Sequence, residues 1–231
     1  MADFFFSHDY VSNNSSKLRK NDGFSSTVLA SISFGASAGG IGVAWDGTNV
    51  MWARGNVGQS IKKGSGFSST VTTSFLSPSA DTTYALHWDG SNIHIAGNTT
   101  KIWRMTGFSS TVNASYSIAS QAFRGVALDG SGNSINSVTT PKTRQQSGFT
   151  ATVSASLTTS MSNRDVAWDN AGNLLSLNAT GKARKYSGFG STVTSSFTIT
   201  VTEALGCHWW TDADAGGVAR DARSLLLLGV G

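Results

Sequence analysis

Short runs of alternating apolar and polar residues recur along the chain, each directly after a Gly-Phe pair. The pairs begin at positions spaced by 43, 41, 41 and 40 residues, namely Gly23, Gly66, Gly107, Gly148 and Gly188. After the third pair, for example, Val112, Ala114 and Tyr116 alternate with polar residues. One serine recurs on the polar side of every run, at Ser31, Ser74, Ser115, Ser156 and Ser196. Apolar residues at every second position predict β-strands.

A second repeated phrase lies between the Gly-Phe pairs. It reads GVAWDGTN around Trp45, ALHWDGSN around Trp88, GVALDGSGN around Leu128, DVAWDNAGN around Trp168 and, in a shorter form, GCHWWTD around Trp209. Gly and Asn tolerate the positive φ of tight hairpin turns, so the Asp-Gly-x-Asn segments predict hairpins. Each unit then contains four strands: a (GVAWD), b after the turn, c in a basic stretch such as KIWRM, and d after Gly-Phe.

Five such units of about 41 residues account for nearly the whole chain. Four-stranded units repeated radially form β-propellers, so we predict an all-β fold with one five-bladed propeller over residues 1–212. The chain begins in a strand b (DFFFSHD) and its last strand a is GCHWWTD. We therefore expect the N-terminal strands to pair with the C-terminal strand and close the ring, which leaves no open edge.

The segment 213–231 exceeds the repeat and ends in RSLLLLGVG. Three placements fit it: a strand b in competition with the N-terminal FFF, an added outer strand, or a docking segment for another subunit. Packing on its own blade is the favoured interpretation. The candidate docking residues are Leu225, Leu226, Leu227 and Leu228.

The composition agrees with strands and turns. Charged residues make up 13% of the chain, Ser and Thr supply about a quarter, and there are 26 glycines. The formal net charge is +4. The single cysteine, Cys207, excludes an internal disulfide and a multi-cysteine zinc site. The first residues lack a basic region followed by an apolar core, so no secretion signal is expected.

Catalytic and metal-binding patterns are weak. Four aspartates occupy the same turn position and are explained by the turn, namely Asp46, Asp89, Asp129 and Asp169. Glu203 and Asp165 stand near the starts of strands a, where a pair of carboxylates would face the channel of a glycosidase-like enzyme. The four histidines are scattered, and His87 and His208 are repeat equivalents. We expect no enzyme, no cofactor and no metal site.

The basic residues gather on strand c, which holds twelve of the seventeen lysines and arginines. We expect a discontinuous basic belt toward the outside of the ring. The favoured interpretation is solubility and protection of strand edges; the alternative is attraction to an anionic surface. Trp103 replaces a basic residue in one blade and is expected to stack on a sugar or pack on a neighbour. The candidate binding residues are Lys62, Lys63, Lys101, Trp103, Arg104, Lys142, Arg144, Lys182, Arg184 and Lys185.

The repeated order of G-V-A-W-D-G-x-N, basic strand and Gly-Phe resembles NHL-type propeller repeats. Five units of this length are similar to the tachylectin-type lectins, and that resemblance implies five blades with amino-sugar sites between them. The low charge and near-identical repeats look like β-rich proteins of bacteriophage particles. We therefore predict a non-enzymatic structural or interaction propeller, with a surface, tail or head role in a virion. The alternatives are a soluble multivalent lectin and, third, a glycosidase-like enzyme.

The expected partners are other virion or surface proteins, or glycans. An anionic surface is also compatible with the basic residues, whereas nucleic acid is not favoured. No membrane span is expected, since no run approaches 18 apolar residues.

Overall fold

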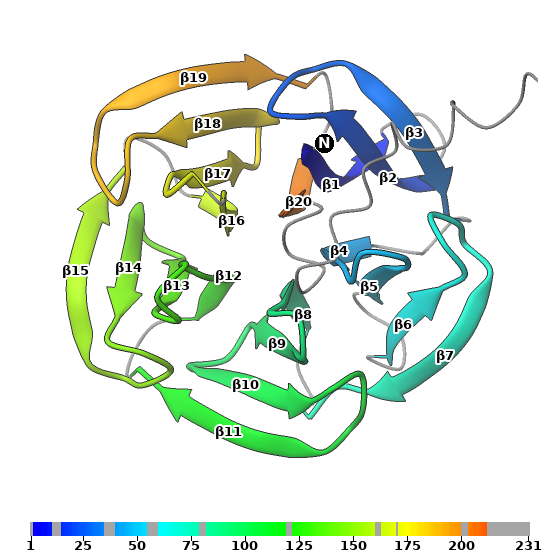
Figure 1. The fold of residues 1–231 in the computed structure, drawn as a ribbon, viewed down its shortest axis with the longest axis horizontal. Helices are drawn as coiled ribbons and strands as arrows, with labels where there is room; N and C mark the ends of the chain where they lie inside the picture. The colour runs from blue at the N-terminus through cyan, green and yellow to red at the C-terminus, as the bar shows by residue number, and fades with distance from the viewer. Residues whose placement is uncertain are drawn as a thin grey trace, which may run out of the picture.

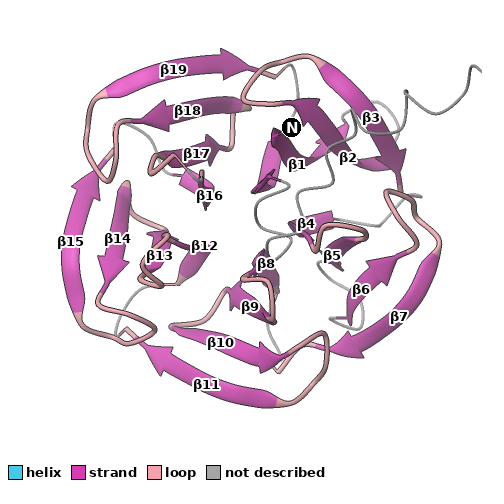
Figure 2. Cartoon of the chain, in the orientation of Figure 1, coloured by secondary structure: helices cyan, strands magenta, loops and turns pink. Residues whose placement is uncertain are grey.

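The computed structural model describes residues 2–10, 15–34, 40–54, 60–78, 82–118, 122–159, 163–169, 171–199 and 203–211. The regular elements in these ranges are twenty β-strands (Figure 2). They form no helix that is long and apolar enough to cross a membrane.

Sixteen consecutive strands form four antiparallel sheets of four strands each. The first contains β4 (Gly40–Trp45), β5 (Val50–Arg54), β6 (Ser60–Gly64) and β7 (Val71–Leu76). The second contains β8 (Thr83–Trp88), β9 (Asn92–Gly97), β10 (Lys101–Thr106) and β11 (Val112–Ser117). The third contains β12 (Phe123–Leu128), β13 (Ser134–Val138), β14 (Lys142–Gln146) and β15 (Val153–Thr158). The fourth contains β16 (Asn163–Trp168), β17 (Leu174–Asn178), β18 (Lys182–Tyr186) and β19 (Val193–Thr198).

The remaining strands form another four-stranded sheet in the order β20-β1-β2-β3. Its members are β20 (Glu203–Thr211), β1 (Ala2–Tyr10), β2 (Ser15–Asp22) and β3 (Val28–Ser33). β1 pairs antiparallel with β20, and Phe6 lies opposite Cys207. The predicted tail at 213–231, with Leu225, Leu226, Leu227 and Leu228, lies outside the described residues.

The sheets are arranged around a central axis with strand a innermost and strand d outermost (Figure 1). Among the inner strands β4 contacts β8, β8 contacts β12, β12 contacts β16, β16 contacts β20, and β20 contacts β4. This arrangement confirms an all-β propeller of four-stranded blades. It also confirms the predicted order of the four strands within each blade.

The two repeated phrases fold as predicted and contact each other. Asp46 Oδ1 accepts hydrogen bonds from the N–H groups of Thr48 and Asn49. Gly47, between Asp46 and Thr48, has φ 94°. The side-chain oxygen of Asn49 then accepts the N–H of Gly66, at the start of a Gly-Phe pair. Asn133 and Gly148 repeat this contact in another blade. The hairpin between strands a and b is therefore tied to the bend between strands c and d.

The Gly-Phe pairs serve the scaffold. All five glycines have φ between 54° and 64°, in a region that residues with a Cβ seldom adopt. Phe108 packs edge-on against Phe75 of the preceding blade, with ring centroids 4.9 Å apart. Phe24 meets Phe197 in the same way, also at 4.9 Å. The phenylalanine of these pairs therefore packs between neighbouring blades.

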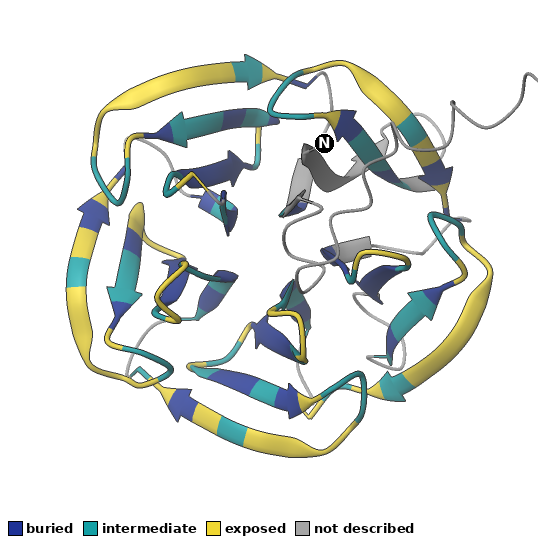
Figure 3. Ribbon diagram, in the orientation of Figure 1, coloured by how far each residue is buried: buried dark blue, intermediate teal, exposed yellow. Residues whose placement is uncertain are grey.

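The outer strand departs from the predicted pattern at its first apolar position (Figure 3). Val28, Val71, Val112, Val153 and Val193 are 42–45% exposed. The most covered residue comes later in each run. It is buried in three of them, at Ile32, Tyr116 and Leu157 with 7% exposure, and half-buried in the other two, at Phe75 and Phe197. On this side of the strand, coverage therefore increases from the first apolar position to the last. The serine of each run is exposed, as expected.

Candidate functional site

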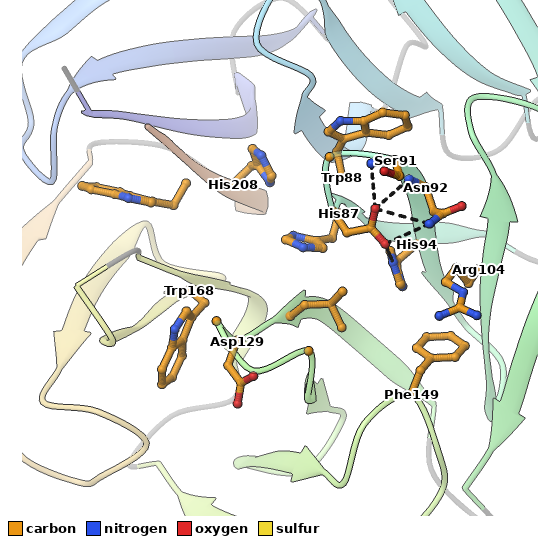
Figure 4. Close-up of a pocket in the computed structure, with 16 residues that line it drawn as sticks. His87, Trp88, Ser91, Asn92, His94, Arg104, Asp129, Phe149, Trp168 and His208 are labelled. Atoms are coloured by element: carbon orange, nitrogen blue, oxygen red, sulfur yellow. Dashed lines mark hydrogen bonds and ion pairs between the residues drawn. The ribbon is translucent and has the colours of Figure 1, made fainter. Parts of the chain in front are cut away.

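A cavity of about 550 Å³ opens among the a–b hairpins (Figure 4). The β8–β9 and β12–β13 hairpins supply much of its wall, while β10, β16 and β20 supply further side chains. The aromatic, charged and amide side chains that line it are Trp88, Asp89, Asn92, His87, His94, Arg104, Asp129, Phe149, Trp168, His208 and Trp209. The cavity thus combines aromatic faces with carboxylates and imidazoles.

Asp89 and His94 form a close pair in this cavity. His94 Nε2 lies 2.8 Å from Asp89 Oδ2, and the His94 side chain is fully buried. Burial lowers the pKa of His94 more than the adjacent carboxylate raises it, so the neutral ring donates its Nε2–H to Asp89. Burial opposes ionisation of Asp89, but the hydrogen bond from His94 and those of the turn N–H groups hold its pKa well below the usual range.

The neutral His94 leaves an acceptor at Nδ1. Within the described part of the chain this buried atom has no hydrogen-bond partner. Since buried polar groups are normally paired, the imidazole is a candidate ligand contact.

Three of the four histidines lie together, contrary to the scattered distribution expected from the sequence. The ring of His87 is 5.5 Å from that of His208 and 5.8 Å from that of His94, between centroids. Burial, followed by the charges of His208 and His94, lowers the pKa of His87. Among the described residues no group of three or more His, Cys, Asp or Glu side chains could hold a metal ion.

The wall between blades β8–β11 and β12–β15 is polar. Tyr116 Oη lies 2.8 Å from Ser134 Oγ and donates to Asn136 Oδ1 at 3.1 Å. Asn136 Nδ2 donates to Gln146 Oε1, and Gln146 Nε2 is buried without a partner in the described residues. Burial raises the pKa of Tyr116 to about 12, so its hydroxyl stays protonated.

Phe149 separates this polar wall from the cavity. Its ring packs edge-on against Tyr116 at 4.8 Å and against His94 at 5.2 Å. The guanidinium of Arg104 lies 5.2 Å from the Phe149 centroid. The Nε of Arg104 also donates to Asn113 Oδ1 at 2.8 Å, so its charge is held at the cavity wall.

The predicted basic residues are divided between two sides of each blade. They lie on β6, β10, β14 and β18, the third strand of four rather than the outermost one. Lys63 contacts Asp46 at 2.5 Å and Lys185 contacts Asp169 at 2.6 Å, so these two lysines are paired. Arg104 lines the cavity. Because neighbouring residues of a strand point to opposite sides, Lys62 and Lys63 lie on opposite faces of their blade.

The other members of the predicted belt lie at the ends and middle of the same strands. Lys142 is exposed, whereas Lys101, Arg144, Lys182 and Arg184 are half-buried. Trp103 is 8% exposed and packs in the apolar cluster that contains Met51 and Ile61 of the preceding blade. Of its two predicted roles, packing on a neighbour is therefore the one observed.

Asp165 does not face an open channel. It is fully buried on β16 and accepts the N–H of Cys207 at 2.8 Å and of Val166 at 2.8 Å. Burial raises its pKa well above the usual value, although these hydrogen bonds act in the opposite sense. Asp165 is a structural contact between strands. The side chain of Glu203 lies outside the described ones.

Most of the cavity residues were not predicted from the sequence, because the repeat already explained them. One signal was available in the departures from that repeat. The position of His94 in strand b is occupied by Met51, Ile135 and Leu175 in three other blades. The position of Ser134 in strand b is occupied by Val50, Ile93 and Leu174 in the same way. Polar residues at positions that are otherwise apolar mark this one interface.

Known proteins resemble this chain in fold. No family model and no curated protein matches the sequence. A crystal structure of a protein of unknown function from Bacteroides caccae matches with a TM-score of 0.56 and 12% identity over 86% of this chain and 73% of that one. Myxococcus xanthus glutaminyl cyclase matches with a TM-score of 0.56 and 10% identity over 74% of this chain and 71% of that one.

The WD40 β-propeller domain of Doa1 matches with a TM-score of 0.51 and 14% identity, over 71% of this chain and 54% of that domain's chain. At these identities the similarity concerns the fold alone. The comparisons therefore place this chain among the β-propellers.

Proposed function

We propose that this chain is a non-enzymatic interaction propeller whose binding site is the cavity among the a–b hairpins. The observation that carries the proposal is the concentration of polar groups at one blade interface. His94, Ser134, Asn136 and Gln146 occupy it, and of these His94 lines the cavity. The buried Nδ1 of His94 has no partner among the described residues. A buried polar atom without a partner destabilises a fold, and a ligand in the cavity that pairs with it would account for its presence.

Binding rather than catalysis is supported by the state of the carboxylates. Asp89 and Asp129 each accept two N–H groups of their own turns, and Asp165 is enclosed between strands. A glycosidase needs one carboxyl group that gives up a proton and a second that acts as base or nucleophile. The low pKa of Asp89 and of Asp129 does not suit a proton donor.

Gly130 allows a direct test of the site. It lines the cavity, and a Cβ added there meets nothing within 4 Å. The variant Gly130→Phe should therefore fill the cavity and leave the fold intact, and Gly130→Ala is its matched control. Ligands found by screening small molecules and glycans should bind the wild type and Gly130→Ala but lose at least tenfold in affinity for Gly130→Phe. Equal affinity for all three would place binding elsewhere.

Carbohydrate binding is the second candidate. Indole faces beside groups that donate and accept hydrogen bonds suit a sugar ring, and Trp88, Asp89 and Asn92 combine these features in the cavity. Because the polar substitutions occur at one interface, we expect one site per chain rather than five. A glycan array followed by calorimetry measures this stoichiometry.

A ring of five blades closed by both ends of the chain forms part of the same proposal. Its support is the register of β1 with β20, in which Phe6 lies opposite Cys207, together with the contacts of β20 with β4 and β16. Directly opposed residues of an antiparallel pair have close Cβ atoms. A Phe6→Cys variant should therefore form a disulfide with Cys207 under oxidation and melt at a higher temperature. Failure to crosslink would contradict this closure.

A role in a virus particle is the most specific part of the proposal. The low charge and close repeats of the sequence support it, and so does one exposed valine on each outermost strand, such as Val71 and Val112. These valines give the rim a repeated apolar contact position. Co-purification with a large assembly, lost on changing all five valines to threonine, is the expected result. A protein that never associates with particles would refute this role.

A further inference from the structure

One equivalent position of strand c, the fourth residue of β6, β10, β14 and β18, carries a positive charge in four of the five sheets. The residues at this position are Lys20, Lys63, Arg104, Gln145 and Lys185. Lys63 contacts Asp46 of its own hairpin at 2.5 Å, and Lys185 contacts Asp169 at 2.6 Å. The same position reaches the aromatic residues of the next blade.

In these four sheets the cation lies near an aromatic ring of the next blade. Lys63 and Arg104 lie near the phenylalanines Phe108 and Phe149, whereas the other two lie near a tryptophan. Lys185 Nζ lies 5.9 Å from the ring centroid of Trp209, and Lys20 Nζ lies 5.9 Å from that of Trp45. Trp45, Trp168 and Trp209 are equivalent residues of strand a. Two sheets thus place an ammonium group against the indole of the next blade, and Lys185 contacts a carboxylate as well. Both contacts favour a cation.

Blade β12–β15 lacks this cation because Gln145 stands in its place. Gln145 Nε2 donates to Asp129 Oδ2 at 2.6 Å, as does Asn133 Nδ2 at 2.9 Å. These donors are neutral, so they do not cancel the charge of the carboxylate. Partial burial opposes ionisation of Asp129, but its hydrogen bonds outweigh that effect and lower its pKa. Asp129 therefore keeps a negative charge without a cationic partner among the described residues.

Trp168 of the next blade shares a cavity with Asp129. This cavity of about 340 Å³ is also lined by Gly130, Ser131 and Gly172, and it borders the larger one, whose wall includes Asp129 and Trp168 as well. A Cβ at either glycine would meet nothing within 4 Å, so the approach is open. No lysine or arginine of the described chain lies over the Trp168 ring. Both groups that would bind a cation, the carboxylate and the indole, are present, and no described residue supplies the cation.

We propose that Asp129 and Trp168 bind an alkylammonium group of a ligand, in the place that a lysine side chain occupies in three of the other sheets. The inference rests on the proposed function, because it names the ligand chemistry of that binding site. The group belongs either to a free primary amine or to a lysine of a partner protein. Since the site is partly exposed to solvent, one ammonium group alone should bind weakly, with a Kd no tighter than about 1 mM.

The test compares n-butylammonium with n-butanol, which has the same chain length and no charge. Binding is followed by the indole N–H resonance of Trp168, assigned with a Trp168→Phe variant. The resonance should shift with the amine and not with the alcohol, and affinity should fall between 50 and 500 mM salt. Equal shifts with both probes, or no shift with the amine, would overturn the proposal.

Two variants of similar side-chain length isolate the charge. Gln145→Lys supplies the ammonium group from within and should weaken n-butylammonium binding at least tenfold. Gln145→Met removes the amide without adding charge and should bind within about twofold of the wild type. Unchanged binding by Gln145→Lys, with a melting temperature close to that of the wild type, would overturn the proposal.

The source of the amine is distinguished with N-acetyl-lysine N-methylamide. Tighter binding of this compound than of n-butylammonium supports a partner's lysine, and the reverse order supports a free amine. The experiments distinguish failure of the ammonium site from failure of the proposed binding function of the cavity. A ligand that is excluded by Gly130→Phe but binds Gln145→Lys normally would retain the proposed function and refute the ammonium site.

Discussion

Asp165 Oδ2 accepts the backbone N–H of Cys207 at 2.8 Å, which joins strands β16 and β20 across 42 positions of sequence. The equivalent residues of the other blades are small: Gly42, Ala85, Gly125 and Gly206. A Cβ on Gly125 would lie 2.7 Å from Asp165 Oδ1 and 2.8 Å from its Cα. The carboxylate therefore fills space that a glycine of the preceding blade leaves open.

Replacement of Asp165 by alanine should destabilise the fold without abolishing ligand binding. It leaves the buried N–H of Cys207 without its acceptor, and an unpaired buried donor costs about 1–3 kcal/mol. Urea unfolding measures the loss, with Ser196→Ala on an exposed strand position as control. A loss of catalytic turnover with unchanged stability would instead revive the enzyme interpretation.

Phe108→Ala tests the wedge between blades. The ring contacts Phe75, and Lys63 Nζ lies 5.9 Å from its centroid. Because Phe108 is half-buried, the cost should be about 2 kcal/mol, below the range for a fully enclosed phenylalanine. Phe108→Leu should recover most of this stability in thermal unfolding. A wild-type melting temperature for the alanine variant would show that the Gly-Phe pair does not hold the blades together.

At the glycines of the Gly-Phe pairs, the effect of a substitution on backbone conformation can be measured without a steric clash. Gly66 has φ +64°, and a Cβ there would meet nothing within 4 Å. Gly66→Ala should therefore cost about 1–2 kcal/mol from backbone conformation alone. Gly130→Ala also meets nothing within 4 Å and carries no such φ, so it should change stability by less than about 0.5 kcal/mol. Equal melting temperatures for the two variants would contradict this explanation.

The propeller could be predicted from the sequence because its signals are local and repeated. The alternation of apolar and polar residues after Gly107 predicts a strand, and the Asp-Gly turn at Gly47 predicts a hairpin. Both signals recur from unit to unit. The exposure of Val112 could not be predicted from the sequence. Alternation assigns a residue to one side of the strand, but it does not say how much of that side the neighbouring blade covers.

The candidate site was hidden by the same repetition. His87 and His208 were explained as equivalent residues, and residues at the same place in different blades converge only when the ring forms. The close approach of His94 to Asp89 likewise depends on the pairing of β8 with β9. An alignment of the repeats would have identified the site. His94 replaces an apolar residue, and Gln145 replaces a lysine or arginine, at positions that are otherwise regular between blades.

His208 should make stability fall as the pH is lowered. It is 2% exposed, and burial lowers its pKa to about 4, while a hydrogen bond with the backbone of Trp45 acts in the opposite sense. In the unfolded chain the pKa is about 6.5. Between these values the unfolded state binds a proton that the folded state does not. The contribution is therefore complete above pH 6.5 and is lost progressively toward pH 4.

The slope is about 1.4 kcal/mol per pH unit for one such histidine, so His208 should contribute a loss of about 2 kcal/mol between pH 7 and 5. His87 and His94 act in the same direction because their pKa values are also lowered. Asp165 acts oppositely, since its raised pKa favours the folded state as acid is added. The measurement is therefore the difference in unfolding free energy between wild type and His208→Gln. This difference should shrink by about 2 kcal/mol from pH 7 to 5, and a constant difference would show that His208 binds protons equally in both states.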